Sequence, residues 1–224
     1  MIKKKKWVII NLFVWMLIIS SMTVYAQTST SNNGDMVKIR DSEFEILIQE
    51  IQNIRNLNPE YTDDIIFIVM NERHPENSKE RSIIDTWNIL TDAEKKLCIR
   101  YPFDALKVNS ARNIAISQTE TKYGYNGLGD KSDAFRHGIW NAEMTVLIGK
   151  EKAELFATAH EDKDVTGNES DGYSKSAHRE MDLHNNEIGR SIGENNKNAS
   201  EDEMADIIFE AVNLQNSQFV WLHE

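Results

Sequence analysis

Cysteine, proline and glycine are scarce in this sequence, and positive charge is in the minority. Its 224 residues include one cysteine, three prolines and ten glycines. The single Cys98 excludes a framework of intrachain disulfides and a four-cysteine zinc site. So few prolines and glycines exclude collagen-like chains and Pro/Gly-rich disordered chains. With 25 basic against 36 acidic side chains, the net charge of -11 argues against a broad nucleic-acid-binding surface.

Residues 1–26 have the pattern of a secretory signal peptide. The lysines from Lys3 to Lys6 precede an apolar stretch from Trp7 to Val24, and the small residue Ala26 ends the segment. The alternative is an uncleaved membrane anchor, but an apolar run of about 18 residues is at the lower limit for spanning a bilayer. We therefore expect cleavage near Ala26, export to the periplasm or the cell exterior, and no stable membrane anchor afterwards.

The rest of the chain predicts an all-α fold, a compact multi-helix bundle. Residues 27–41 begin with a polar run rich in Ser, Thr and Asn, which predicts a disordered linker. Residues 42–90 are expected to form an N-terminal helical segment, and residues 91–224 a helical domain, because apolar residues recur at helical spacing in both. The main competing interpretation is a β-strand at the apolar run of residues 65–70.

Capping residues mark several helix starts. The Ser/Thr-x-x-Glu pairs that predict capping boxes are Ser42 with Glu45, Thr91 with Glu94, and Ser200 with Glu203. Ser132 is expected to cap a helix that begins at Asp133. Pro102 is expected to interrupt the chain before a helix resumes at Ala105. The sequence leaves open whether residues 36–90 share the core of the remaining chain or only pack on it.

Polar residues follow the apolar stripes of three expected helices. They are Asp133, His137 and Asn141 on the first helix, His160 and Glu161 at the end of the next, and Asp182 and Asn185 on the third. Those of the first helix share a face with large apolar residues such as Trp140, which should turn that face inward. Because buried polar groups need partners, we expect these side chains to meet inside the protein.

Two kinds of chemistry fit such a cluster. Asp133 and His137 are four residues apart on one helix, where a carboxylate can orient an imidazole as a general base. Alternatively, His137 and His160 with a carboxylate from Asp182, Glu161 or Asp133 would provide the three N/O ligands of a catalytic zinc site. The structural alternative is a buried hydrogen-bond network without chemistry. The strict H-E-x-x-H zinc motif is not present in the sequence.

The loop that begins at Asp162 imitates the start of a calcium-binding loop. Gly167 occupies its sixth position, but Tyr173 occupies the twelfth, where a bidentate Glu is needed. We therefore expect a solvated acidic loop there and no calcium. Cys98, which lies between two apolar residues, is expected to be buried. His184 points away from Asp182 on a helical wheel and is expected to be peripheral.

Three blocks of the sequence resemble a bacterial family of unknown function, the domain-of-unknown-function family 6973. The blocks are Asn126 to Asn141, Ala159 to Glu161, and Glu180 to Arg190, within a resemblance that covers about residues 91–192. The positions that match the family pattern are Asp133, Phe135, Arg136, His137, Trp140, Asn141, His160, Glu161, Met181, Asp182, Asn185, Asn186 and Gly189. His178 is outside the pattern, which weakens it as a ligand. The resemblance supports the location of the site and implies no particular reaction.

Three functions fit these patterns. The first is an exported, metal-assisted hydrolase of an ester or phosphodiester in a small molecule or a lipid. Its site residues would be Asp133, His137, Asn141, His160, Glu161 and Asp182, with His137, His160 and Asp182 as zinc ligands. The second is a non-catalytic secreted module in which these residues form a structural polar core. The third is a toxin-like effector domain with a cognate immunity protein. The helical wheel places Arg136 beside the buried stripe rather than on it.

Overall fold

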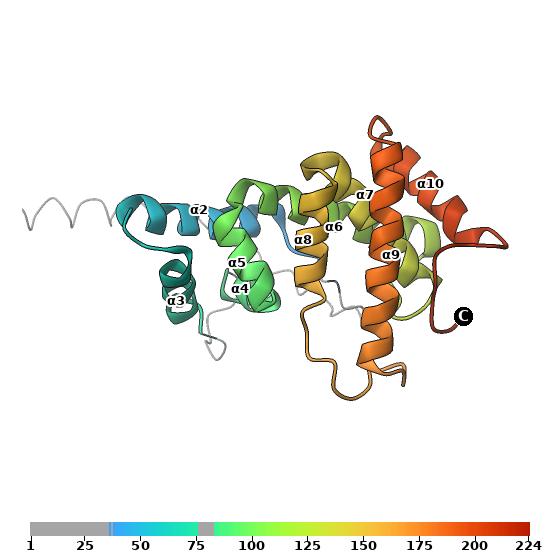
Figure 1. The fold of residues 1–224 in the computed structure, drawn as a ribbon, viewed down its shortest axis with the longest axis horizontal. Coiled ribbons are helices and arrows are strands. Elements are labelled where there is room, and N and C mark those ends of the chain that lie inside the picture. The colour runs from blue at the N-terminus through green and yellow to red at the C-terminus, as the bar shows by residue number, and fades with distance from the viewer. Residues whose placement is uncertain (1–35, 37, 76–82) are drawn as a thin grey trace, which may run out of the picture. The chain divides into compact units, whose positions relative to one another are not determined.

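The structure, a computed structural model, describes residues 36, 38–75 and 83–224 (Figure 1). This part of the chain is all-helical, as predicted, and its β structure is limited to one isolated bridge. Its helices are α2 (Asp41–Leu57), α3 (Asp63–Arg73), α4 (Ile83–Ile89), α5 (Asp92–Arg100), α6 (Pro102–Tyr123), α7 (Lys131–Ile148), α8 (Lys150–His160), α9 (Lys175–Asn195) and α10 (Glu201–Asn213). The predicted signal peptide and most of the predicted linker lie outside the described residues. Within those residues, no helix combines the length and the apolar character needed to cross a membrane.

Side-chain caps fix two of the helix starts as predicted. The confirmed capping boxes are Thr91 with Glu94 in α5 and Ser200 with Glu203 in α10. The box predicted for Ser42 and Glu45 is wrong, because α2 already begins at Asp41 and has no side-chain cap. The competing strand at residues 65–70 is also wrong. That run lies inside α3, where only part of it is buried.

The starts of α6 and α7 differ from the sequence-based expectation. Pro102 is the first residue of α6, where the missing N–H of proline costs no helical hydrogen bond. The cap of α7 is Asp130 rather than Ser132, because the Asp130 carboxylate accepts from the backbone N–H groups of Ser132 and Asp133. The Ser132 hydroxyl instead accepts from the backbone N–H of Gly127 at 2.8 Å.

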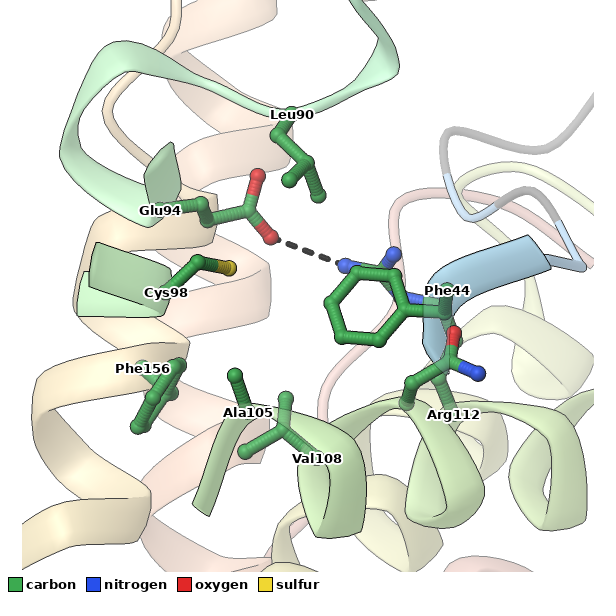
Figure 2. A pocket seen from close by; sticks show the side chains of 9 residues that line it. Phe44, Leu90, Glu94, Cys98, Ala105, Val108, Arg112 and Phe156 are labelled. Atoms are coloured by element: carbon green, nitrogen blue, oxygen red, sulfur yellow. Dashed lines mark hydrogen bonds and ion pairs between the residues drawn. The ribbon is translucent and has the colours of Figure 1, made fainter. Parts of the chain in front are cut away.

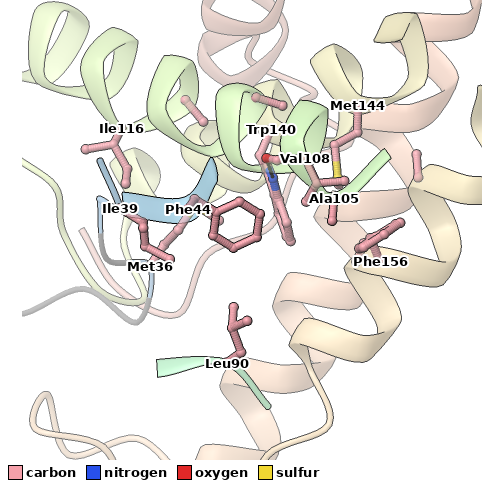
Figure 3. Packing of buried hydrophobic residues seen from close by; sticks show 14 of the residues in the cluster. Met36, Ile39, Phe44, Leu90, Ala105, Val108, Ile116, Trp140, Met144 and Phe156 are labelled. Carbon is pink, nitrogen blue, oxygen red and sulfur yellow. Dashed lines mark hydrogen bonds between the residues drawn. The ribbon is translucent and has the colours of Figure 1, made fainter. Parts of the chain in front are cut away.

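One hydrophobic core joins the N-terminal helices to the helical domain. Phe44 of α2 and Trp140 of α7 are buried in the same cluster (Figure 3). Ile39, near the end of the predicted linker, is buried there as well. The described residues before α5 therefore share the core and do not form a separate unit packed on it. Cys98 is buried as predicted, and burial raises the pKa of its thiol.

Helix α7 is central to this arrangement and contacts α6, α8, α9 and α10. Two glycines allow α9 to approach it closely. A Cβ atom at Gly189 would lie 2.3 Å from the carbonyl oxygen of Gly138, and one at Gly193 would lie 2.5 Å from that of Ala142. Larger residues at either position would push the two helices apart. This close crossing brings the polar stripe of α9 against the polar stripe of α7.

Residues 214–224, here called the C-terminal strap, lie against α9 and the loop before α7. Phe219 anchors the strap in the core. The Asn185 side chain accepts from the backbone N–H of Val220 at 3.0 Å and donates to the Val220 carbonyl at 2.9 Å. The backbone N–H of Leu222 donates to the carbonyl of Gly129 at 2.7 Å. The strap therefore connects the loop that precedes α7 with the middle of α9.

Candidate functional site

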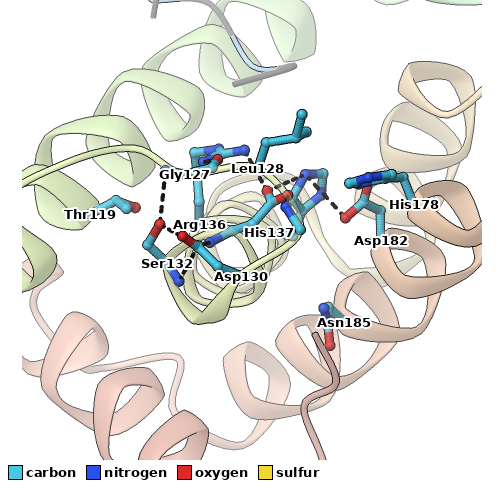
Figure 4. Close-up of polar contacts among 12 residues, drawn as sticks. Thr119, Gly127, Leu128, Asp130, Ser132, Arg136, His137, His178, Asp182 and Asn185 are labelled. Carbon is cyan, nitrogen blue, oxygen red and sulfur yellow. Dashed lines mark hydrogen bonds and ion pairs between the residues drawn. The ribbon is translucent and has the colours of Figure 1, made fainter. Parts of the chain in front are cut away.

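Helices α7 and α9 bring three predicted site residues together. The Nε2 atom of His137 lies 3.5 Å from Oδ1 of Asp133 and 3.5 Å from Oδ1 of Asp182. Figure 4 shows His137 and Asp182 pointing toward each other from the two helices. All three side chains are buried, and their ligand atoms lie within 4.8 Å of one another. Among the described residues, they form the group that could hold a metal ion.

The carboxylate of Asp133 is held in place by its own end of α7. Its Oδ2 atom accepts from the backbone N–H of Gly129 at 2.6 Å. Its Oδ1 atom forms an ion pair with Arg136, whose Nη1 also donates to the Gly127 carbonyl at 2.9 Å. Arg136 is fully buried, so the expectation that it lies beside the buried stripe is wrong. Because both carboxylate oxygens are engaged, Asp133 has a fixed orientation toward His137.

The other ring nitrogen of His137 faces an amide network. Its Nδ1 atom lies 3.2 Å from Oδ1 of Asn186, which also accepts from Nδ2 of Asn141 at 2.5 Å. Nδ2 of Asn186 donates to Oε1 of Glu161 at 3.3 Å. Oδ1 of Asn141 accepts from Nη1 of Arg190 at 3.0 Å. Asn141 and Glu161 therefore belong to this network, which lies on the Nδ1 side of the ring, away from the two aspartates.

His160 belongs to a second buried cluster, beside the first. Its Nδ1 atom lies 3.0 Å from Oε1 of Glu94, and the same oxygen accepts from Nη2 of Arg112 at 2.8 Å. Burial opposes ionisation of Glu94, but the charges of His160 and Arg112 lower its pKa to about 2. The ring of His160 is 6.4 Å from that of His137. His160 is therefore not among the three residues whose ligand atoms lie together. Asp133 takes the position in that group that the sequence analysis gave to His160.

A small cavity lies at this second cluster. Glu94, Cys98 and Arg112 line it together with apolar side chains such as Phe44 and Phe156 (Figure 2). The Nε atom of Arg112 is buried there without a hydrogen-bond partner. Its lining is mainly apolar and contains one carboxylate, that of Glu94, which is already paired with Arg112.

The remaining histidines of the second half lie at the edge of the site. His178 contacts Asp171 at 2.9 Å, and His223 of the strap contacts the same carboxylate at 3.2 Å. The Nε2 atom of His184 lies 2.8 Å from the carbonyl of Gln218, in an exposed position, which agrees with its predicted peripheral place. The acidic loop that begins at Asp162 is exposed, also as predicted.

The predicted site residues did not include several residues that support the site. Asn186 is one turn after Asp182 on α9, and the family resemblance included it, so helical spacing could have identified it. Arg190 continues the same face one turn further. Glu94 was interpreted only as a capping residue. Gly129, with φ of 76°, joins Asp133 to the strap, and no local pattern in the sequence indicates that contact.

The fold and the site together define an all-α domain with a buried Asp/His/Asp group on two crossing helices. The chain belongs to the family described as "Domain of unknown function (DUF6973)", which matches residues 95–216. The matched region includes every predicted site residue and ends inside the strap. Neither the curated proteins nor the solved structures gave a match. The family expected from the sequence is confirmed, and it assigns no activity.

Proposed function

We propose that Asp133, His137 and Asp182 bind a zinc ion. The observation that carries the proposal is the pair of 3.5 Å distances from Nε2 of His137 to the two aspartate oxygens. Hydrogen bonds between nitrogen and oxygen are usually about 2.7–3.2 Å long. Ligands at about 2.0–2.2 Å from a tetrahedral zinc ion are about 3.3–3.6 Å apart. The observed separations therefore suit atoms that share a cation better than atoms that share a proton.

The chemistry of the donor atoms favours zinc over calcium or magnesium. One imidazole nitrogen and two carboxylate oxygens form a mixed N/O set, which zinc accepts in tetrahedral coordination. Calcium prefers six to eight oxygen ligands, and magnesium prefers near-octahedral oxygen coordination with several waters. All three donor residues are buried, so a small ion with few ligands fits the space better than a large hydrated one.

Three protein ligands leave a fourth position for water, which is the usual arrangement of catalytic zinc. Zinc lowers the pKa of a bound water to about 7, so this water could attack an ester or phosphodiester near neutral pH. We therefore propose a metal-assisted hydrolase as the function of this domain. Arg136 would orient Asp133, and Glu161 and Asn141 would position the His137 ring. Export of the protein is part of the proposal and rests on the signal-peptide pattern of residues 1–26.

A substrate would reach this buried site only after part of its cover moves. We propose that the C-terminal strap makes that movement, because apart from the buried Phe219 it is held by hydrogen bonds to residues such as Asn185 and Gly129. Gly129 connects the strap to the site. Its backbone N–H donates to Asp133, and its carbonyl accepts from the backbone N–H of Leu222. Displacement of the strap would free this loop and open a route to His137.

The experiment is a measurement of zinc content and zinc binding by the purified protein, without an affinity tag. Elemental analysis and calorimetric titration with Zn²⁺ should give one zinc per chain. Asp182→Asn and His137→Gln should lose it. The matched control is His184→Gln, an exposed histidine on the same helix as Asp182, which should retain it. If the wild type takes up no zinc, the metal centre and the metal-assisted reaction are both rejected.

A second function, a non-catalytic module with a structural polar core, is favoured by the complete burial of the cluster. Under that alternative, His137→Gln lowers the free energy of unfolding by about 1–3 kcal/mol in zinc-free buffer, because its buried partners are left unsatisfied. Added zinc then stabilises neither protein. Under the metal-site proposal, zinc at about 100 times its Kd stabilises the wild type by about 2.7 kcal/mol. Urea titrations with and without zinc distinguish the two functions.

A further inference from the structure

The amide network behind His137 ends in two groups that each have a single hydrogen-bonding role. At one end, the Arg190 guanidinium can only donate, and it donates to Oδ1 of Asn141 at 3.0 Å. At the other end, the Glu161 carboxylate accepts from Nδ2 of Asn186 at 3.3 Å. The orientation of each asparagine amide is therefore fixed from outside the His137 ring.

These two ends impose the same orientation on the contact between the amides. Because Oδ1 of Asn141 faces Arg190, Nδ2 of Asn141 must point the other way, toward Asn186. Because Nδ2 of Asn186 faces Glu161, Oδ1 of Asn186 must receive that donor, and it does so at 2.5 Å. A second bond from Nδ2 of Asn141 to the His137 carbonyl, at 3.1 Å, ties the network to α7.

The network leaves His137 with one choice. Oδ1 of Asn186 is an acceptor and lies 3.2 Å from Nδ1 of His137, so Nδ1 must carry a proton. In a neutral imidazole the second nitrogen then carries none. That nitrogen is Nε2, the atom that faces Asp133 and Asp182. Asn141, Asn186 and His137 are each fully buried, so bulk water does not compete for these contacts.

We propose that Asn186, held by Glu161 and by the Asn141–Arg190 pair, is a positioning residue that selects the Nδ1–H tautomer of His137. The selected tautomer presents the Nε2 lone pair to the two aspartates, which is the state that a cation at this point requires. The purpose of the selection rests on the proposed zinc site. The tautomer itself is a property of the metal-free protein and can be measured without any ion.

The test is an NMR measurement on the metal-free full chain, labelled with ¹⁵N in the histidine rings. Two-bond and three-bond correlations between ring protons and nitrogens distinguish a protonated from an unprotonated nitrogen. The wild type should show His137 with a protonated Nδ1, and raising the pH until the ring is neutral should leave that proton on Nδ1. A neutral ring that carries its proton on Nε2 overturns the proposal. This measurement needs no variant, so it decides the question even if substitutions at the site prevent folding.

Substitutions then assign the selection to Asn186. Asn186→Leu removes the acceptor and should shift His137 to the Nε2–H tautomer, which donates toward the aspartates. The matched control is Asn195→Leu at the exposed C-terminal end of the same helix, and it should retain the Nδ1–H tautomer. If Asn186→Leu folds and retains the wild-type tautomer, Asn186 is not the selecting group.

Zinc affinity links the tautomer to the proposed function but is measured separately. Competition with a zinc chelator should show that Asn186→Leu binds zinc 10–100-fold more weakly than the wild type, about the usual cost of losing an outer-shell partner. An unchanged affinity would mean that the network does not serve the zinc ligand. If the wild type binds no zinc but shows the Nδ1–H tautomer, the zinc site fails while the selection by Asn186 stands.

Discussion

Two buried histidines, His137 and His160, have rings only 6.4 Å apart, but their surroundings are opposite. Around His160, one carboxylate, Glu94, accepts hydrogen bonds from two basic groups at 2.8 and 3.0 Å. Around His137, one imidazole nitrogen faces two carboxylates, each at 3.5 Å. In the first cluster a carboxylate lies between two basic groups, whereas in the second an imidazole nitrogen lies between two carboxylates.

This difference shows that two buried histidines can have different roles, depending on the charged groups around each ring. A buried charge is costly unless it is paired at short range. Glu94 is paired with Arg112 and His160, and Asp133 is paired with Arg136. The proposed zinc site rests on the two 3.5 Å separations between the aspartates and Nε2 of His137, which are longer than usual hydrogen bonds. We therefore interpret the His160 cluster as structural and the His137 cluster as a cation site. Sequence alone would have grouped the two histidines as equivalent ligands.

The largest expected effect comes from Glu94→Gln, which tests the structural interpretation of the second cluster. Glutamine can keep the capping box with Thr91 but leaves Arg112 buried without its counter-charge. We expect a loss of about 3 kcal/mol in the free energy of unfolding near neutral pH, measured by urea denaturation. Zinc binding at His137 should remain. A loss of zinc in this variant would mean that the two clusters act as one site.

The pH dependence of this effect has a defined sign. Folding lowers the pKa of Glu94 from its ordinary value of 4.5 to about 2, so its ionised form stabilises the native state. That contribution is complete above about pH 4.5 and is lost as the pH falls toward 2. The difference between wild type and Glu94→Gln should therefore shrink over this range. A difference that stays constant down to pH 2 would show that Glu94 contributes through packing and not through its charge.

A smaller effect is expected from Asn185→Ala, which tests how the two histidines are covered. The substitution removes both hydrogen bonds to Val220 of the strap and should cost about 1–2 kcal/mol. Loosening of the strap should expose His137 and leave His160 unchanged. Modification by diethyl pyrocarbonate, mapped by mass spectrometry, should therefore become faster at His137 relative to His160. Equal acceleration at both histidines would indicate general unfolding instead of strap opening.

Much of the fold could be predicted from the sequence, because it is local. The pairs Thr91 with Glu94 and Ser200 with Glu203 predicted two helix starts, since a capping box involves residues three apart. The cap of α7 was missed for the same local reason, because Asp130 and Ser132 are both possible caps and the Asp130 carboxylate accepts the backbone N–H groups. Helical spacing also placed Asp133 and His137 together on one buried face.

The composition of the site could be predicted only in part, because its contacts are distant in sequence. That Asp182 reaches His137 depends on the close crossing of α7 and α9 at Gly138 and Gly189, which no periodicity reveals. Glu94 and His160, whose side chains are in contact, are 66 residues apart in the chain. The strap has no regular structure, so nothing in its sequence predicts that Leu222 binds the loop before α7. Residue types were predictable here, while their pairing depended on packing.

The smallest effect is expected from Asp164→Asn, which compares the buried aspartates with an exposed one. Asp164 lies in the calcium-like loop, and the N–H and hydroxyl of Thr166 lower the pKa of its carboxyl. The carboxylate is exposed to solvent and its hydrogen bonds are local, so neither folding nor zinc binding should depend on it. We expect an unchanged unfolding midpoint, an unchanged zinc content, and no heat of binding when wild type is titrated with Ca²⁺. A saturable calcium signal that Asp164→Asn abolishes would place a second cation site in this loop. It would also show that an exposed aspartate of this protein can bind a cation, so that burial does not distinguish the aspartates that bind cations from those that do not.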